Sequence, residues 1–148
     1  MDWTDLLVEP RQVTGLYGAA PDLDAFRLDR IELYGQTATL WGDFAELPAV
    51  LPDRWRGSGR TRVAARFDLS GVRTAEVRGT PRLRFNGVAG YEGQPVDLAI
   101  SVAGSVWKDQ NGTERPHILV TGEAEFVSFR FVSEDVNVQA RGEEPQVA

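Results

Sequence analysis

Apolar and polar residues alternate along most of the chain after residue 25, which is the pattern of β-strands with one buried and one solvated face. Residues 96–107 show the pattern best, because apolar residues occupy every second position from Val96 to Val102 and Val106 follows. Residues 62–69 repeat it, with arginines on the polar side. About eight such short segments, with frequent turns and no helix between them, predict a mainly β protein at the margin of the α+β class. We expect an antiparallel curved sheet or sandwich.

The first two strands are predicted to form a hairpin whose first strand is irregular. Its apolar residues change parity between Leu28 and Ile31, so a β-bulge near residues 29–30 would keep both halves facing the core. Tyr34-Gly35-Gln36 then turns the chain. On the second strand, Trp41 and Asp43 fall on the face opposite the apolar row.

Residues 2–18 are predicted to be helical. Asp2 can cap a first helical turn whose apolar residues, beginning with Trp3, fall on one face. Pro10 suits the start of a second helix, and Gly18 suits its end. We expect this segment to pack at one edge of the sheet, with Trp3 in the core between helix and sheet.

Turn residues define the segments between the clearer strands. Residues 45–60 contain two prolines and two glycines and predict a loop anchored by Trp55. Asn86-Gly87 is a favoured two-residue hairpin turn. The three glycines of residues 87–93 predict a flexible loop that carries Tyr91. A weaker strand is predicted from Val72 to Val77.

Length and composition narrow the class of protein. The 148 residues predict one domain over residues 1–141 and a polar tail over residues 142–148. The chain has no cysteine and one histidine, which removes disulfides, thiolate nucleophiles and metal clusters built on either residue type. No run approaches the roughly 20 apolar residues that span a bilayer, and the acidic start is unlike a signal peptide. We expect a cytoplasmic protein without a cofactor, a metal ion or a membrane partner.

The net charge of -6 is unevenly distributed along the chain. Residues 53–84 hold nine arginines and three acidic residues, a net charge of +6, which leaves -12 on the rest. A nucleic-acid site is one interpretation of such a block. We favour the other, in which outward arginines on central strands pair with acids on neighbouring strands, because a chain with a pI near 4.8 suits phosphate binding poorly.

The sequence contains no recognisable catalytic motif. His117 would need a serine or threonine beside it and an orienting acid, and its surroundings are those of a strand start. Glu123 and Glu125 share one strand face, so a hydrolase that uses them is an alternative, although any acidic β protein offers such pairs. We expect that the protein is not an enzyme.

The order of short sequence words along the first half of the chain is informative. Trp3-Thr4-Asp5-Leu6 is followed by Leu16-Tyr17-Gly18, with Pro21 and Leu23, and by paired strands at residues 28–33 and 39–43. Leu51-Pro52-Asp53-Arg54-Trp55 then precedes Gly59 and the strand at residues 62–69. In this order the words resemble bacterial immunity protein family 50 of the polymorphic toxin systems over residues 2–79, and residues 122–138 are similar to the family's closing strands. The resemblance implies a protein that protects its producer by binding a cognate toxin domain.

The candidate toxin-binding residues are two acids and three aromatic residues: Asp43, Glu46, Trp55, Trp41 and Tyr91. The acids would attract a basic partner, since toxins that act on nucleic acid are often basic, and the aromatic side chains would anchor it. A carbohydrate- or ligand-binding β-sandwich module that uses the three aromatic residues is the alternative. The two acids also fit a surface that only keeps the domain soluble or balances the arginine strands.

Overall fold

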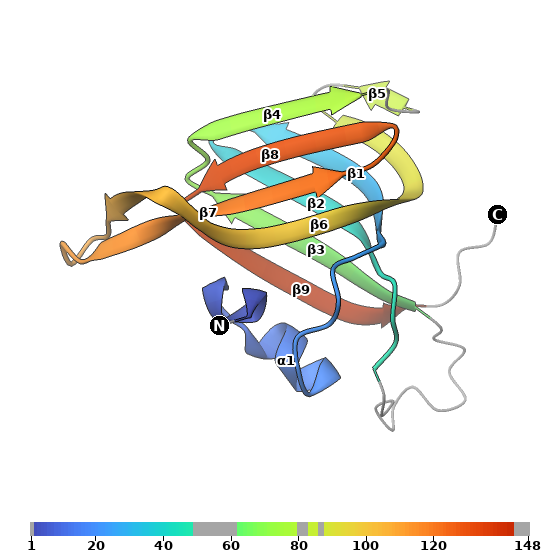
Figure 1. The fold of residues 1–148 in the computed structure, drawn as a ribbon, viewed down its shortest axis with the longest axis horizontal. Coiled ribbons are helices and arrows are strands. Elements are labelled where there is room, and N and C mark those ends of the chain that lie inside the picture. The colour runs from blue at the N-terminus through green and yellow to red at the C-terminus, as the bar shows by residue number, and fades with distance from the viewer. Residues whose placement is uncertain (1, 49–61, 80–82, 86–87, 144–148) are drawn as a thin grey trace.

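The computed structural model describes residues 2–48, 62–79, 83–85 and 88–143, and it shows a mainly β protein built on one open, strongly curved antiparallel sheet (Figure 1). Eight of the nine strands in these residues follow one another in the hydrogen-bonded order β4-β8-β7-β6-β1-β2-β3-β9, and β5 pairs with β6. The predicted class and the antiparallel sheet are therefore confirmed. The strands are β1 (Phe26–Tyr34), β2 (Thr37–Phe44), β3 (Arg62–Ser70), β4 (Thr74–Gly79), β5 (Leu83–Phe85), β6 (Val88–Lys108), β7 (Glu114–Glu123), β8 (Val127–Ser133) and β9 (Asp135–Glu143).

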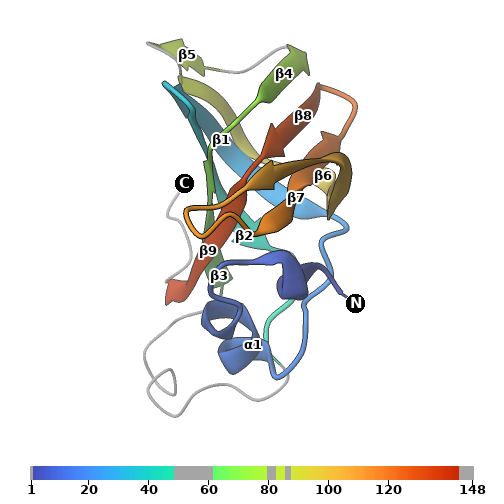
Figure 2. The same ribbon diagram turned by 90° about the vertical axis from the view of Figure 1, so that its left-hand side faces the viewer.

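Two corners fold the sheet over its own inner face. The long strand β6 makes the first, because its first half pairs with β1 up to Val96 and its second half pairs with β7 from Asp97 onward. Glu134 makes the second, since it alone separates β8 from β9, two strands that lie far apart in the sheet order. Figure 2 shows the resulting curl, with β8, β7 and the second half of β6 on one side and β2, β3 and β9 on the other.

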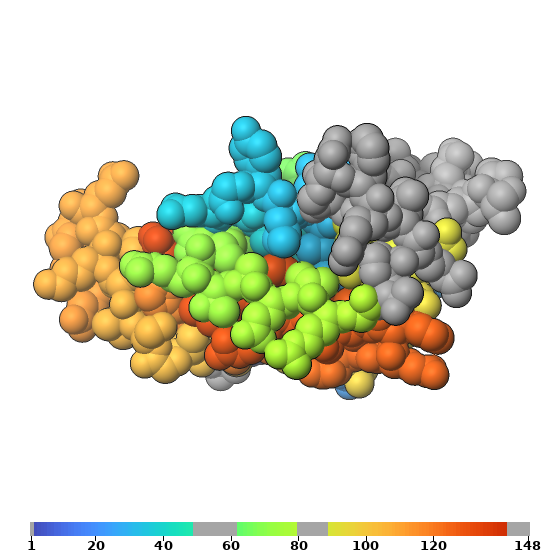
Figure 3. All heavy atoms as spheres, turned by 90° about the horizontal axis from the view of Figure 1, so that it is seen from above, coloured from blue at the N-terminus to red at the C-terminus, as the bar shows by residue number. Residues whose placement is uncertain are grey.

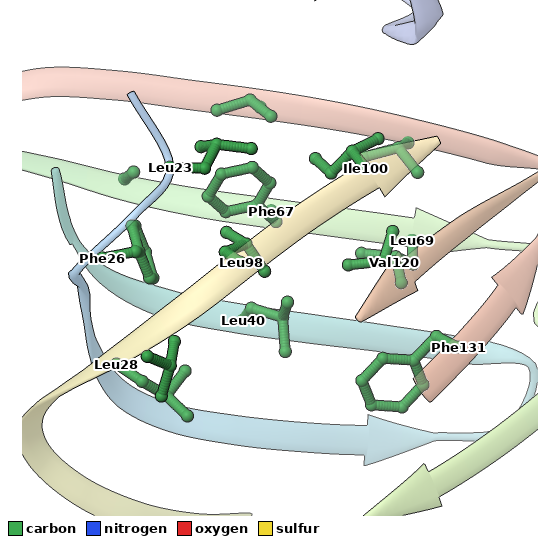
Figure 4. Close-up of a cluster of buried hydrophobic side chains, with 14 of the residues drawn as sticks. Leu23, Phe26, Leu28, Leu40, Phe67, Leu69, Leu98, Ile100, Val120 and Phe131 are labelled. Carbon is green, nitrogen blue, oxygen red and sulfur yellow. The ribbon is translucent and has the colours of Figure 1, made fainter. Parts of the chain in front are cut away.

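The core fills the space between these two halves. Figure 4 shows Leu40 and Phe67, from β2 and β3, grouped with Leu98, Val120 and Phe131 from β6, β7 and β8. All five side chains are buried, as the alternating pattern predicts.

The hairpin of β6 and β7 extends past the core. In Figure 3 it projects in orange from one end of the molecule, and β4 lies in green across the same view. The pairing of β6 with β7 shifts register between Val102 and Val106, and both valines are exposed. They were predicted to continue the buried row, but no second layer of the sheet covers this part of β6 among the described residues. The hairpin turns at residues 109–112, where the Gly112 N–H donates to the Asp109 carbonyl, 3.0 Å away.

The amino-terminal segment packs on the β9 edge, as predicted. It consists of the 3-10 helix η1 (Trp3–Leu6), which has an Asp2–Asp5 capping box, and α1 (Arg11–Tyr17), which ends at Gly18 with φ +76°. The Val8 N–H donates to the Val136 carbonyl of β9 at 3.0 Å.

Two local predictions are wrong. Residues 88–93 belong to β6 and do not form a flexible loop, and Tyr91 is buried, at 1% exposure. Positive φ angles at Glu92 and Gly93 kink β6 there, which turns the Tyr91 ring into the core. The second error concerns the tail, because β9 continues to Glu143, past the predicted boundary at residue 142.

The other segment predictions vary in outcome. The weak strand predicted at residues 72–77 is observed as β4, on the sheet edge opposite β9. Trp55 and the turn at Asn86-Gly87 lie outside the described residues, although Phe85 and Val88 on either side of that turn are paired.

Candidate functional site

Arg30 lies on the outer face of the sheet, next to a β-bulge in β1. Leu28 pairs with Gly42 and Arg30 with Trp41, so Asp29 is the extra residue on β1. The bulge confirms the irregularity predicted from the parity change. The register from Tyr34 to Arg30 is regular, so the turn already sets Arg30 opposite Trp41, and the extra residue returns Leu28 to the core face.

Four residues in register form a row across β1, β2, β3 and β9, which we call the arginine–tryptophan row: Arg30, Trp41, Arg66 and Gln139. The guanidinium carbon of Arg30 lies 4.3 Å from the centroid of the Trp41 ring. That of Arg66 lies 5.4 Å from the same centroid. Both distances are within the range of cation–π attraction. Trp41 Nε1 is buried without a hydrogen-bond partner in the described part of the chain, and the two guanidinium groups contact the ring.

Acids flank the row and pair with Arg66 of the row and with Arg62 beside it. Arg62 donates to Asp43 Oδ1, and Arg66 Nε donates to Asp68 Oδ2 at 3.0 Å. Burial raises the pKa of Asp43, while the Arg62 and Arg27 charges oppose that rise. The prediction that outward arginines pair with acids on neighbouring strands is confirmed for Arg62 and Asp43.

A shallow groove runs beside the row. It encloses about 580 Å³ and is lined by Trp41, by glycine and alanine residues, and by charged and amide side chains that include Asp29, Asp43, Arg62, Arg66 and Arg141. Small-molecule sites are mostly lined by apolar side chains around a few polar groups. The composition of this groove therefore suits contact with a polar protein surface better than capture of a small apolar ligand.

The five predicted contact residues differ in where they lie in the structure. Trp41 and Asp43 do lie together on the outer face, and Trp55 lies outside the described residues. Glu46 lies beside the amino-terminal segment, where its carboxylate accepts from the Asp22 N–H at 2.7 Å.

The prediction of Tyr91 as a contact residue is corrected, since its side chain is buried at 1% exposure and offers no surface to a toxin or a carbohydrate. Asp43 accepts from Arg62 and lies near Arg27, so arginines surround it, and its role as a toxin contact stays a prediction.

Sequence reasoning missed Arg30 and Arg66 as site residues. A signal for Arg30 was present, because the turn after Tyr34 places it opposite Trp41. The pairing of Arg66 with Trp41 has no local signal, since residues 45–61 separate β2 from β3.

His117 has a neighbour that the sequence did not reveal. Ser105 Oγ and His117 Nδ1 lie 2.9 Å apart, across the irregular part of the β6–β7 pairing. The other ring nitrogen, Nε2, is buried and has no hydrogen-bond partner within the described residues. A nucleophile–base pair needs a third group that orients the base. Among the described residues this pair lacks one, so its geometry provides a buried polar contact and not a catalytic triad.

A second groove lies between η1 and the β6–β7 hairpin and encloses about 890 Å³. Trp107 forms part of its wall, and Asp109 at its rim is paired with Arg115 at 2.8 Å. The described residues contain no group of three or more histidines, cysteines or acids placed to hold a metal ion, and no helix among them is long and apolar enough to cross a membrane.

Comparisons with known proteins identify no relative of this chain. No family model matches it, and neither does any curated protein or solved structure. The resemblance to immunity protein family 50 therefore stays a prediction.

Proposed function

We propose that this chain is an immunity protein that binds and neutralises a cognate toxin domain in the cytoplasm of the producing cell. The observation that carries the proposal is the arginine–tryptophan row on the outer face of the sheet. Tryptophan and arginine are the residue types that most often dominate the binding energy of protein interfaces. Here one tryptophan stands between two arginines on hydrogen-bonded strands.

The position of the row favours binding without a large rearrangement. Trp41 and Arg66 lie on β2 and β3, which are paired on both sides within the sheet. Side chains on such strands keep their directions, so little conformational entropy is lost when a partner docks. The groove beside the row adds a concave element into which a side chain of the toxin can insert.

Co-expression with the toxin domain encoded by the neighbouring gene tests the proposal. We expect the chain to restore growth and to co-purify with that domain. Trp41→Ala should weaken the complex by about 2 kcal/mol, which is roughly thirtyfold in Kd. Trp107→Ala is the matched control, because Trp107 is also partly buried but lies on the hairpin and not on this face.

Two results would be decisive: the first contradicts the immunity function, and the second contradicts only the assignment of the interface to the arginine–tryptophan row. One is the absence of a complex between the folded chain and an inactivated toxin domain at micromolar concentrations. The other is a Trp107→Ala variant that loses binding while Trp41→Ala keeps it, which would move the interface to the hairpin groove. Circular dichroism of each variant separates a lost contact from a lost fold.

A further inference from the structure

The position of Arg30 suits the binding of a carboxylate. Its side chain is exposed, and its guanidinium lies over the Trp41 ring at 4.3 Å. A guanidinium that rests on an aromatic face still directs the N–H groups of its planar edge outward, and this edge matches the two oxygens of a carboxylate. The ring restricts the long side chain, so less entropy is lost when the edge is occupied.

Two acids of this face are paired with other arginines. Asp43 accepts from Arg62, and Asp68 accepts from Arg66. Within the part of the chain that the structure describes, Arg30 has no ion pair of its own. Arg30 thus has charge and directed donors without a carboxylate from the described part of its own chain.

We propose that the arginine–tryptophan row binds an acidic segment of the toxin, with Arg30 holding a carboxylate of that segment in two parallel hydrogen bonds. This inference rests on the proposed function and adds the chemistry of the partner to it. It reverses the expectation that the toxin meets an acidic face of this chain through Asp43 and Glu46. The partner's contacting segment carries aspartate or glutamate, whatever the net charge of the rest of the toxin.

A protein carboxylate suits this face better than nucleic acid. Duplex DNA carries one negative charge per about 1.7 Å along its length, so it needs an extended basic surface. Here the next row across the strands is acidic, because Glu32 and Asp68 lie beside Thr39 and Asn137 in register. The basic strip is therefore narrow, and the chain as a whole carries -6. A short acidic segment can lie on the strip, whereas a long polyanion would also meet the acids.

The test uses a hexaglutamate peptide as the probe and the indole N–H signal of Trp41 as the readout in a ¹H–¹⁵N NMR titration. The Trp41→Phe variant assigns that signal among those of the four tryptophans. We expect a saturable shift that weakens as the salt concentration rises. Arg30→Gln should reduce the affinity at least tenfold. Arg30→Lys should restore only part of it, because a lysine keeps the charge but lacks the planar fork.

Matched probes and a matched variant complete the experiment. Arg130→Gln removes an exposed arginine on β8, away from the row, and should leave the titration unchanged. Hexalysine should leave the Trp41 signal in place. No shift with hexaglutamate, or an equal shift in Arg30→Gln, would overturn the inference. Tighter binding of a ten-nucleotide single-stranded DNA than of hexaglutamate would also overturn it, because the face would then recognise phosphate.

The same variants separate this inference from the proposed function. If the toxin domain binds and Arg30→Gln leaves its Kd unchanged, the immunity function stands and carboxylate recognition by Arg30 fails. If hexaglutamate binds through Arg30 but the toxin domain forms no complex, the reverse holds.

Discussion

The ring of Phe129 on β8 lies directly over Gly122 on β7, its partner in register. A Cβ atom at position 122 would lie 2.3 Å from two carbons of that ring, which is closer than nonbonded carbons approach. Phe129 is buried at 3% exposure, so the ring has no free space into which it can move. A side chain at position 122 therefore fits only if the Phe129 ring is displaced.

Gly122→Ala should destabilise the protein by about 1–3 kcal/mol, because the added methyl group overpacks a filled core. Urea unfolding followed by circular dichroism measures the loss. Gly104→Ala is the control, since nothing lies within 4 Å of a Cβ there and its change should stay within about 0.5 kcal/mol. Equal effects of the two variants would mean that the Phe129 ring moves aside without a measurable cost.

Trp3 should contribute more to stability than its partial exposure suggests. Its ring centroid lies 6.3 Å from that of Phe44 and 6.1 Å from that of Phe67, and its Nε1 donates to the Pro21 carbonyl at 3.0 Å. We expect Trp3→Ala to cost about 3 kcal/mol and Trp3→Phe about 1 kcal/mol, because phenylalanine keeps the ring contacts and loses the hydrogen bond. Thermal or urea unfolding checks both. A phenylalanine variant as unstable as the alanine variant would assign the stability to the hydrogen bond.

Asp43 should make stability fall as the pH rises. Burial raises its pKa above the ordinary value of 3.8, and the Arg62 charge opposes that rise without cancelling it. Because the folded protein holds this proton more tightly than the unfolded chain, the stabilisation is complete below pH 3.8 and is lost as the pH rises through the folded pKa. Relative to Asp43→Asn, the unsubstituted protein should therefore become less stable over that interval. Unfolding curves of both proteins from pH 3 to pH 7 measure the difference, and a difference of opposite slope would show that the Arg62 charge dominates burial.

Asp109 should have the opposite pH dependence. Its pKa is lowered, first by the hydrogen bond from Arg115 and then by the backbone N–H of Thr113. The stabilisation is therefore present above the unfolded value of 3.8 and is lost as the pH falls through the folded pKa. Asp109→Asn should lose stability relative to the unsubstituted protein at pH 6 and lose less as the pH falls. Arg115→Gln removes the same pair from the other side, so a double variant should cost little more than either single one.

Predictions from the sequence succeeded where short-range chemistry decides the structure. The Asp2 cap, the end of α1 at Gly18 and the bulge at Asp29 follow from residues within a few positions of one another. Tyr91 shows the limit of such reasoning. Glycines near it indicate a loop, but pairing with β1 and the kink at Glu92 and Gly93 turn its ring inward.

The sequence by itself determined the class of fold and one half of the candidate site. Alternation places Trp41 and Asp43 on the outer face, and the turn after Tyr34 sets Arg30 opposite Trp41, because a short hairpin fixes its own register. The other half depends on the tertiary structure. Arg66 lies beside the Trp41 ring only because β2 pairs with β3, although residues 45–61 separate these strands in the sequence. Gln139 joins the row only because β3 pairs with the last strand. Those registers depend on which buried side chains pack together on the inner face of the sheet, where Phe67 lies between Leu40 and Val138. No local signal in the chain encodes that packing.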